Sequence, residues 1–283
     1  CTRRRFDLRL HADEWIAFDP LGAQDPAWTT GDFEPITFSD EPACGPHDAV
    51  LNLGLKLVGG ISIREYQTEA EGVAYSQLTV HGVIDDDGNR VPVIPGTSWA
   101  GALLARCKDT RVVQSYGNHA ITLFGTVNEQ TKEQMRSRVI IDESTVSGGT
   151  WKAYTRNSID RFTGGTVDTA LYSEEMYWGG TTKLVLTIRN VSQLCNDPSA
   201  ALRPLVATLA DLHNGFLAVG GHTAVGRGMF AIDQERSTVL VGGTNVTQEF
   251  FRAFLGNASN GFAQPNVAAV AKLLSEEPQT KGG

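Results

Sequence analysis

The sequence predicts an α+β fold in which an antiparallel sheet carries helices on one face. Three observations support this expectation. Apolar and polar residues alternate in several short segments, two longer segments repeat their apolar residues at helical spacing, and turns rich in glycine or proline separate them. With 283 residues, of which 41% are hydrophobic and 20% charged, the chain can build one large core or two small ones.

The first half of the fold is expected to begin with a half-buried strand over 50–58, where apolar residues recur with a period of two. The segments 77–84 and 91–94 flank a connection of Asp, Gly and Asn, and this pattern predicts a hairpin. A helix is expected from about Thr97 to Lys108. Its apolar face carries Trp99, Leu103 and Cys107.

The second half repeats this order after a strand over 137–142. The long polar stretch from 148 to 180 contains aromatic residues and predicts a protruding hairpin or loop. The segment Asn196-Asp197-Pro198-Ser199 is expected to open the next helix, and Pro204 is awkward within it unless the regular helix starts there. The flanking strands are expected over 183–188, 216–219 and 228–232. Strand, helix, strand, insertion, strand, helix, strand is the order of a ferredoxin-like (RRM-like) sheet.

Composition restricts the classes of function. The formal net charge of −8 argues against nucleic-acid binding over the whole surface, because phosphate affinity comes largely from cations. The four cysteines show no zinc-binding spacing, and no apolar run approaches the ~20 residues that span a bilayer, so we expect a cytoplasmic protein with reduced thiols. Cations nevertheless gather in a few segments and predict a basic groove on an acidic body. They are Arg106, Lys108, Arg136, Arg138, Lys152, Arg156, Arg161 and Arg227.

The segment from Val91 to Leu104 runs from an apolar strand through a Pro-Gly turn into a helix. Thr97 and Ser98 are expected to cap the first amides of the helix, and Gly96 lets another backbone come close. Such a helix start favours phosphate. An ordinary connection between a strand and a helix is the alternative.

A glycine-rich loop between Gly220 and Gly228 offers backbone amides with little side-chain bulk, which suits close approach of RNA phosphates. Arg227 adds a cation to this loop and favours the RNA interpretation over a simple tight turn. His222 has no second metal ligand at a suitable spacing, and Gly221 and Thr223 complete the candidate surface.

A third segment, from Arg156 to Gly165, combines positive charge with an aromatic ring. Arg156, Arg161 and Phe162 suit single-stranded RNA held by backbone contacts and stacking, whereas a solvated loop is the alternative. Asp160 has no companion acid nearby. We therefore expect it to pair with an arginine or cap a turn rather than catalyse a reaction.

These segments occur in one order, together with Leu123-Phe124-Gly125 and the strand from Ser137 to Glu143, and this set resembles the RAMP superfamily of CRISPR-associated proteins. The similarity extends over about 51–232 and is greatest to the backbone subunits of type III effector complexes, which coat the guide RNA. It implies a ferredoxin-like RAMP core with a thumb-like insertion that presses into the guide–target duplex.

The resemblance also implies partners and RNA-binding residues. The partners are a CRISPR guide RNA, a target RNA, other RAMP subunits and a large polymerase-like subunit. The Ile-Asp-Arg-x-Thr-Gly pattern of the family matches Ile159 to Gly164. The residues expected to bind RNA are Gly96, Thr97, Ser98, Arg106, Arg156, Arg161, Phe162, Thr163, Gly164, Gly220, Gly221, His222, Thr223 and Arg227.

Catalysis is where the sequence departs from the family. Active backbone subunits cleave target RNA with Mg²⁺ or Mn²⁺ and an aspartate, and the matching position here falls close to Tyr75, which cannot replace a carboxylate. We therefore favour a binding subunit that needs no metal to hold RNA. A metal-dependent endoribonuclease with Glu69 or Glu71 as the ligand is the alternative. A guide-processing ribonuclease is a third class, with Tyr75 and His119 as acid–base candidates.

The expected domain organisation follows from these segments. Residues 1–47 form an N-terminal segment, interpreted as the tail of a preceding RAMP unit plus a linker, since 5–18 and 238–255 share a strand-then-helix pattern. Chance similarity is the alternative to that repeat. The RAMP domain is expected over 48–236, with its insertion at about 145–180, and a C-terminal strand and helices over 237–283. A first residue of Cys1 suggests a piece of a longer product.

Overall fold

The computed structural model describes residues 2–3, 34–35, 44–63, 79–84, 90–127, 130–256 and 262–276. The chain divides into two compact units, Cys1–Pro42 and Ala43–Gly283. In the first unit, β1 (Thr2–Arg3) pairs antiparallel with β2 (Glu34–Pro35). The pattern over 5–18, and with it the predicted repeat, lies outside the described residues.

The second unit is built on a five-stranded antiparallel sheet with the order β15-β14-β3-β13-β9. Its strands are β3 (Ala49–Val58), β9 (Val139–Ile141), β13 (Thr181–Ile188), β14 (Met229–Val241) and β15 (Thr244–Asn245). Two helices connect them, α3 (Gly96–Cys107) and α6 (Pro198–His213). Without β15, the chain order β3-α3-β9-β13-α6-β14 gives the sheet order β14-β3-β13-β9, so the predicted ferredoxin-like topology is confirmed.

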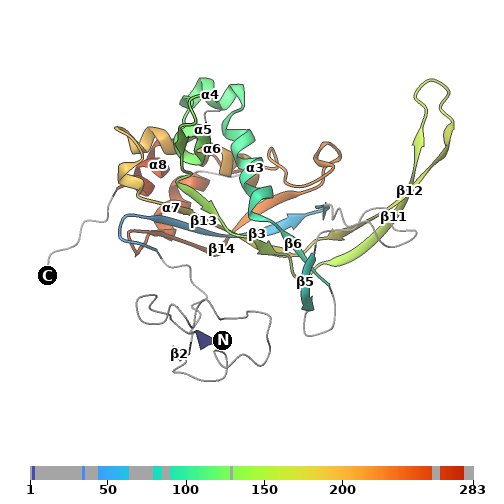
Figure 1. Ribbon diagram of the computed structural model, residues 1–283, viewed down its shortest axis with the longest axis horizontal. Coiled ribbons are helices and arrows are strands. Elements are labelled where there is room, and N and C mark those ends of the chain that lie inside the picture. The colour runs from blue at the N-terminus through green and yellow to red at the C-terminus, as the bar shows by residue number, and fades with distance from the viewer. Residues whose placement is uncertain are drawn as a thin grey trace. The chain divides into compact units, whose positions relative to one another are not determined.

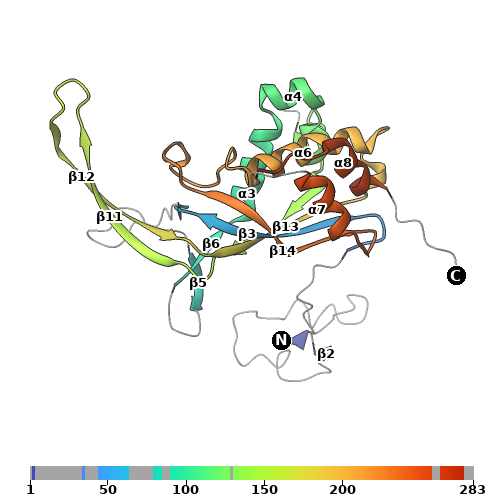
Figure 2. The ribbon, with the colours of Figure 1, turned by 180° about the vertical axis from the view of Figure 1, so that it is seen from behind.

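The helices lie on one face of this sheet (Figures 1 and 2). Around α3 and α6 are α4 (Thr110–Tyr116), α5 (Ala120–Phe124), α7 (Thr247–Leu255) and α8 (Val267–Ser275). Alternate residues of β3, including Leu51, Leu53 and Leu55, face the helices and are at most 1% exposed. Trp99 and Leu103 of α3 pack into the same core, as their helical spacing predicted.

The central strand is more deeply buried than its alternating pattern predicts. Neighbouring strands flank β3 on both sides, and a bulge over 234–237 in β14 lies against its other face. The Gly54 amide donates to Ser237 Oγ at 2.9 Å, and a Cβ at Gly54 would lie 2.6 Å from Arg236 Cβ. Burial of β3 therefore comes from its central place in the sheet, which its own sequence does not reveal.

Helix α6 starts at Pro198, as the segment 196–199 predicts, and its regular part does not wait for Pro204. Asp197 caps it by accepting from the Ala200 amide at 2.9 Å, and Pro198 occupies the first turn, where no amide is needed. Pro204 lies inside the helix and is buried. Its missing amide removes one helical hydrogen bond at this buried position.

The strand predicted over 216–219 does not form, and a single bridge joins Ala218 to Met229. In contrast, 229–232 and 238–241 are two halves of the same strand β14. Residues 237–241 and helices α7 and α8 therefore pack with the RAMP-like core in one unit.

Several hairpins extend this core. β5 (Thr79–Ile84) pairs antiparallel with β6 (Arg90–Ile94), as predicted, and β6 also pairs with β10 (Ser144–Thr145). β11 (Thr150–Ile159) and β12 (Thr166–Trp178) form the hairpin predicted within 148–180, and it projects away from the helices (Figures 1 and 2). The remaining short strands are β4 (Gly60–Ile61), which pairs with β12, and β7 (Thr126–Val127), which pairs with β8 (Gln134–Met135). In the described part of the chain, no helix is long and apolar enough to cross a membrane.

Candidate nucleic-acid interface

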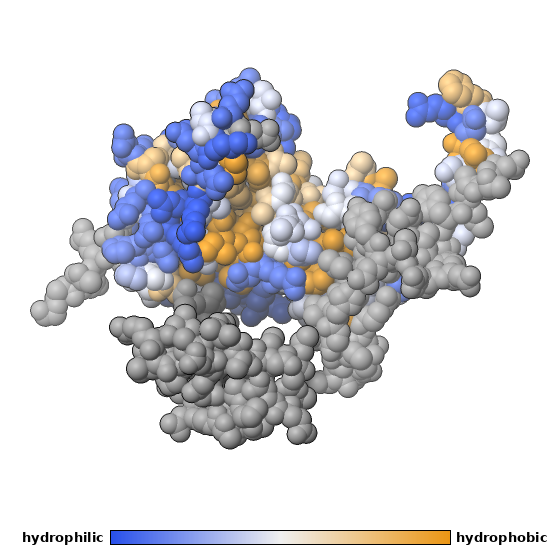
Figure 3. Space-filling model, viewed as in Figure 1, coloured by the Kyte–Doolittle hydropathy of each residue, from blue (hydrophilic) through white to orange (hydrophobic). Residues whose placement is uncertain are grey.

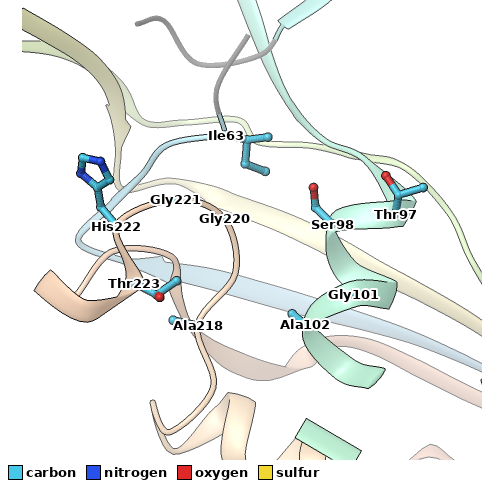
Figure 4. Close-up of a pocket in the computed structure, with 10 residues that line it drawn as sticks. All are labelled: Ile63, Thr97, Ser98, Gly101, Ala102, Ala218, Gly220, Gly221, His222 and Thr223. Atoms are coloured by element: carbon cyan, nitrogen blue, oxygen red, sulfur yellow. The ribbon is translucent and has the colours of Figure 1, made fainter. Parts of the chain in front are cut away.

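Two of the predicted motifs meet in one open groove of about 680 Å³. The start of α3 forms one wall and the glycine-rich loop forms the other, with Ile63 between them (Figure 4). The groove is lined by Ile63, Thr97, Ser98, Gly101, Ala102, Ala218, Gly220, Gly221, His222 and Thr223. Motifs more than 100 residues apart in the sequence therefore build a single surface.

The α3 wall differs in one respect from the sequence prediction. Pro95, rather than Thr97 or Ser98, occupies the N-cap position, and no side chain caps the helix. Because the helix begins at Gly96, both hydroxyl-bearing residues lie within its first turn and donate to no other described group. Gly96 does allow a close backbone approach, as predicted, because a Cβ there would lie 2.4 Å from the Ile141 carbonyl oxygen.

The glycine loop is held against the end of β3 and β4 by backbone hydrogen bonds. Gly221 N donates to Ser62 O at 2.7 Å, and Gly228 N donates to Gly60 O at 2.9 Å. Gly220 has a φ of +100°, and a Cβ on it would lie 2.9 Å from Ser62 O. Glycine is required there both for the backbone conformation and for the approach to Ser62.

The groove presents hydrogen-bond donors on both walls and no carboxylate among its described lining residues. Among the described residues, the amides of Gly220 and Thr223 have no hydrogen-bond partner, and the hydroxyls of Thr97 and Ser98 stand on the opposite wall. None of the described residues that line the groove is acidic. This arrangement suits an anion or a sugar–phosphate chain, although the protein as a whole is acidic.

Beside the groove, a buried carboxylate joins the hairpin to the glycine loop. Glu174 of β12 is 4% exposed and accepts from both terminal nitrogens of Arg227, with Nη1 at 2.9 Å from Oε2. Arg156 Nε lies 3.0 Å from Glu174 Oε1, and His222 Nδ1 lies 3.5 Å from Oε2. The hydrogen bonds from Arg227, followed by the charges of Arg227, Arg156 and His222, hold the pKa of Glu174 below its ordinary value despite burial. Glu174 is therefore an ionised carboxylate at neutral pH.

The far end of the hairpin is organised by local contacts. Asp160 Oδ1 accepts from the amides of Phe162 at 2.7 Å and Thr163 at 3.0 Å, which confirms that this acid caps a turn. These amides hold the pKa of Asp160 below its usual range. The side chain of Phe162 is 93% exposed, and Figure 3 shows apolar and hydrophilic surface side by side at this tip. Asp160 lies six residues along the chain from Tyr154, which pairs with Glu174, and this corresponds to roughly 20 Å of extended strand.

The structure thus distributes the predicted RNA-binding residues over several places. Thr97, Ser98, Gly220, Gly221, His222 and Thr223 line the groove, and Arg161, Phe162, Thr163 and Gly164 form the hairpin tip. Arg106 lies near the other end of α3, where its Nε is 2.7 Å from Asp211 Oδ2 of α6. Arg227 is 4% exposed, so its guanidinium group faces Glu174 rather than the solvent. Sequence reasoning placed Arg227 in the loop correctly and missed its partner.

The predicted catalytic candidates Glu69, Glu71 and Tyr75 lie outside the described residues, and their roles stay predictions. His119 occupies the residue before α5 and is half-buried. Among the residues that the structure describes, no group of three or more His, Cys, Asp or Glu side chains could hold a metal ion.

Comparison with protein families decides the classification. A family model described as the RAMP superfamily matches residues 75–231, which is more than half of the chain. This chain belongs to the RAMP superfamily. The match includes α3, the hairpin and the glycine loop up to the start of β14, so both walls of the groove lie in the part shared with the family.

The chains of solved structures that are similar to this one include two at low identity. One belongs to a cryo-EM structure of the type III-B Cmr-beta bound to cognate target RNA, with 12% identity, 69% of this chain and 62% of that chain covered, and a TM-score of 0.44. The other belongs to a CRISPR RNA-guided surveillance complex, with 15% identity, coverages of 68% and 67%, and a TM-score of 0.47. This chain spans less than two thirds of the length of the Cmr-beta chain that it matches. No curated protein matches.

Proposed function

We propose that this chain is a guide-RNA-binding backbone subunit of a type III CRISPR effector complex that takes part in recognising target RNA. Membership of the RAMP superfamily supports the class of protein, and the groove supports the activity. The observation that carries the proposal is the meeting of the α3 start and the glycine loop in one groove with donors on both walls. RNA phosphates and 2′-hydroxyls are the acceptors that such a groove fits.

In this proposal the groove contacts the RNA backbone, and base pairing between guide and target supplies sequence recognition. Arg161 and Phe162 at the hairpin tip contribute charge and a stacking surface about 20 Å from the base of the hairpin. The protein partners are other RAMP subunits and a large polymerase-like subunit. Binding needs no metal ion, since backbone amides and hydroxyl groups make the contacts. Metal-dependent cleavage through Glu69 or Glu71 remains the sequence-based alternative.

The experiment compares two matched substitutions in the full chain assembled with guide RNA. Thr97 and Thr110 are exposed and lie in the first turns of α3 and α4, where an added carboxylate is favourable for the helix. Thr97→Glu places a negative charge on the wall of the groove and is expected to weaken RNA binding about tenfold or more. Thr110→Glu makes the same charge change outside the groove and is expected to leave affinity unchanged.

Filter binding with guides of unrelated sequence, over a range of salt and with EDTA, measures these effects. We expect the same loss for every guide and no effect of EDTA on the wild-type affinity. Equal affinities of the two glutamate variants, or no RNA binding by the wild-type chain, would contradict the proposed groove. A loss confined to one guide sequence would mean that the groove reads bases.

A further inference from the structure

The cluster around Glu174 carries more positive than negative charge. One carboxylate faces two guanidinium groups, so a full positive charge is left over before His222 contributes. Burying such charges is costly unless they are paired and hydrogen-bonded. The bidentate contact between Glu174 and Arg227 satisfies the two buried groups, whose side chains are each 5% exposed. The excess charge therefore belongs to the more exposed member, Arg156.

Arg156 is held in a defined orientation although much of it is exposed. Its Nε lies 3.0 Å from Glu174 Oε1 in an ion pair, its guanidinium carbon lies 5.8 Å from the centre of the Tyr154 ring, and its side chain is 41% exposed. The two terminal nitrogens donate to no other described group. A guanidinium group with one edge used by a carboxylate and the other edge open can bind a phosphate through two parallel hydrogen bonds.

The position of this open edge relates it to the groove. His222 lines the groove and lies 3.5 Å from Glu174 Oε2, while Arg156 contacts the other oxygen of the same carboxylate. His222 and Arg156 therefore both lie next to the Glu174 carboxylate. An RNA strand that leaves the groove past His222 toward the hairpin passes this site.

We propose that Arg156 binds an RNA backbone phosphate at the base of the hairpin and that Glu174 is the positioning residue that presents it. This inference rests on the proposed function, because it assumes RNA in the groove. Arg227 is the internal counter-ion of Glu174 and makes no RNA contact. Glu174 thus supports RNA binding although it is negatively charged.

The decisive test is the sign of the effect of Glu174→Gln on RNA affinity. Simple electrostatics predicts that removing a negative charge near RNA strengthens binding. If Glu174 positions Arg156, the substitution should instead weaken RNA binding about fivefold. The salt slope should also fall by about one, since Arg156 no longer holds one phosphate. The control is Glu175→Gln, which removes the same charge from the neighbouring residue on the other face of β12 and is expected not to weaken binding.

Arg156→Gln provides a second arm that leaves the buried pair of Glu174 and Arg227 in place. It is expected to reduce affinity and salt slope about as much as Glu174→Gln does. The double variant with both substitutions is expected to bind no more weakly than Arg156→Gln alone, because both act through one contact. Arg161→Gln at the hairpin tip is expected to add its effect fully to that of Glu174→Gln.

Thermal unfolding of each variant shows whether the fold is retained, and the Arg156 arm decides the question if Glu174→Gln fails to fold. Equal or tighter RNA binding by folded Glu174→Gln, an unchanged salt slope in Arg156→Gln, or additive effects of the two would overturn the inference. These outcomes differ from failure of the proposed function, in which wild-type chain does not bind RNA or Thr97→Glu binds as well as Thr110→Glu.

Discussion

The base and the tip of the β11–β12 hairpin use the same kinds of residue in opposite ways. At the base, Glu174 and Arg227 come from elements 53 residues apart and bury their charges against each other. At the tip, Asp160 bonds the amides two and three residues after it, and Arg161 makes no ion pair in the described structure. Long-range contacts organise the base, whereas the local sequence organises the tip.

This difference shows why charge and position in a motif do not define a role. Arg161 and Arg227 both stand in loops with several glycines, and both were predicted to contact RNA. One is exposed and the other is 4% exposed. What lies across from each arginine in the fold decides between a phosphate contact and an internal counter-ion.

The largest expected effect is a difference in the free energy of unfolding between variants of these two arginines. Arg227→Ala leaves the Glu174 carboxylate buried without its bidentate partner, so the free energy of unfolding should fall by about 3 kcal/mol. Arg161→Ala removes an exposed side chain and should change it by less than about 0.5 kcal/mol. Urea unfolding of both variants measures the difference. Equal stabilities would mean that the buried pair contributes little to the fold.

For RNA affinity, we expect the two variants to rank in the opposite order from their loss of stability. Arg161→Ala should weaken binding to unrelated guides, because the tip contributes charge to the RNA backbone in the proposed function. Arg227→Ala, measured where it remains folded, should act through the displaced Arg156. A reduced salt slope in Arg227→Ala combined with Arg156→Gln, beyond that of Arg156→Gln alone, would show that Arg227 does contact RNA.

Two glycines with positive φ allow the same comparison between the glycine loop and the hairpin tip to be made for the backbone. Gly220 of the glycine loop has a φ of +100° with Ser62 O 2.9 Å from the place of a Cβ, whereas Gly164 at the tip has a φ of +68° and no atom within 4 Å. Both alanine variants incur the conformational cost of about 1 kcal/mol, and Gly220→Ala adds a backbone collision. Chemical unfolding should show a loss for Gly220→Ala at least about 1 kcal/mol larger. The opposite ranking would contradict the packed loop.

Much of the fold could be predicted from the sequence because its elements have local signals. The turn residues between β5 and β6, the Asp197 cap of α6 and the helical spacing of Trp99, Leu103 and Cys107 each act within a few residues. These signals also predicted the element order that gives the ferredoxin-like sheet. The strand predicted over 216–219 failed because that segment has strand-like composition but lacks a continuous partner strand.

The candidate site was predictable in its parts and not in its assembly. Glycine content and hydroxyl residues identified both walls of the groove. The partners of Arg227 and Arg106 could not be predicted, since Glu174 and Asp211 lie 53 and 105 residues away and nothing near them in the sequence indicates pairing. An acid within a strand was the available signal for Glu174, and its neighbour Glu175 shares that signal.

Acid titration is expected to affect the base of the hairpin through Glu174. Its pKa is lowered from 4.5 in the folded protein, so the stability that its ionised form contributes is fully present above about pH 4.5 and is lost as the pH falls through the lowered pKa. The stability gap between wild type and Glu174→Gln should therefore be larger at about pH 7 than at about pH 3. Urea unfolding at several pH values measures it. A gap that stays constant with pH would show that the carboxylate charge does not stabilise the fold.

The smallest expected effect is a local one, which should be confined to the amides of the hairpin tip. Asp160→Ala removes the acceptor for the Phe162 and Thr163 amides, so these two amides should exchange with solvent deuterium faster, while urea unfolding stays unchanged. Asp160→Asn is the matched control, because its amide oxygen can accept the same bonds without the charge. In the wild type, the pKa of Asp160 is lowered, so the charge-assisted part of this protection should be present at neutral pH and decline as the pH falls through that pKa. If Asp160→Ala lowered global stability as Arg227→Ala does, the tip would not be the locally organised region that its contacts indicate.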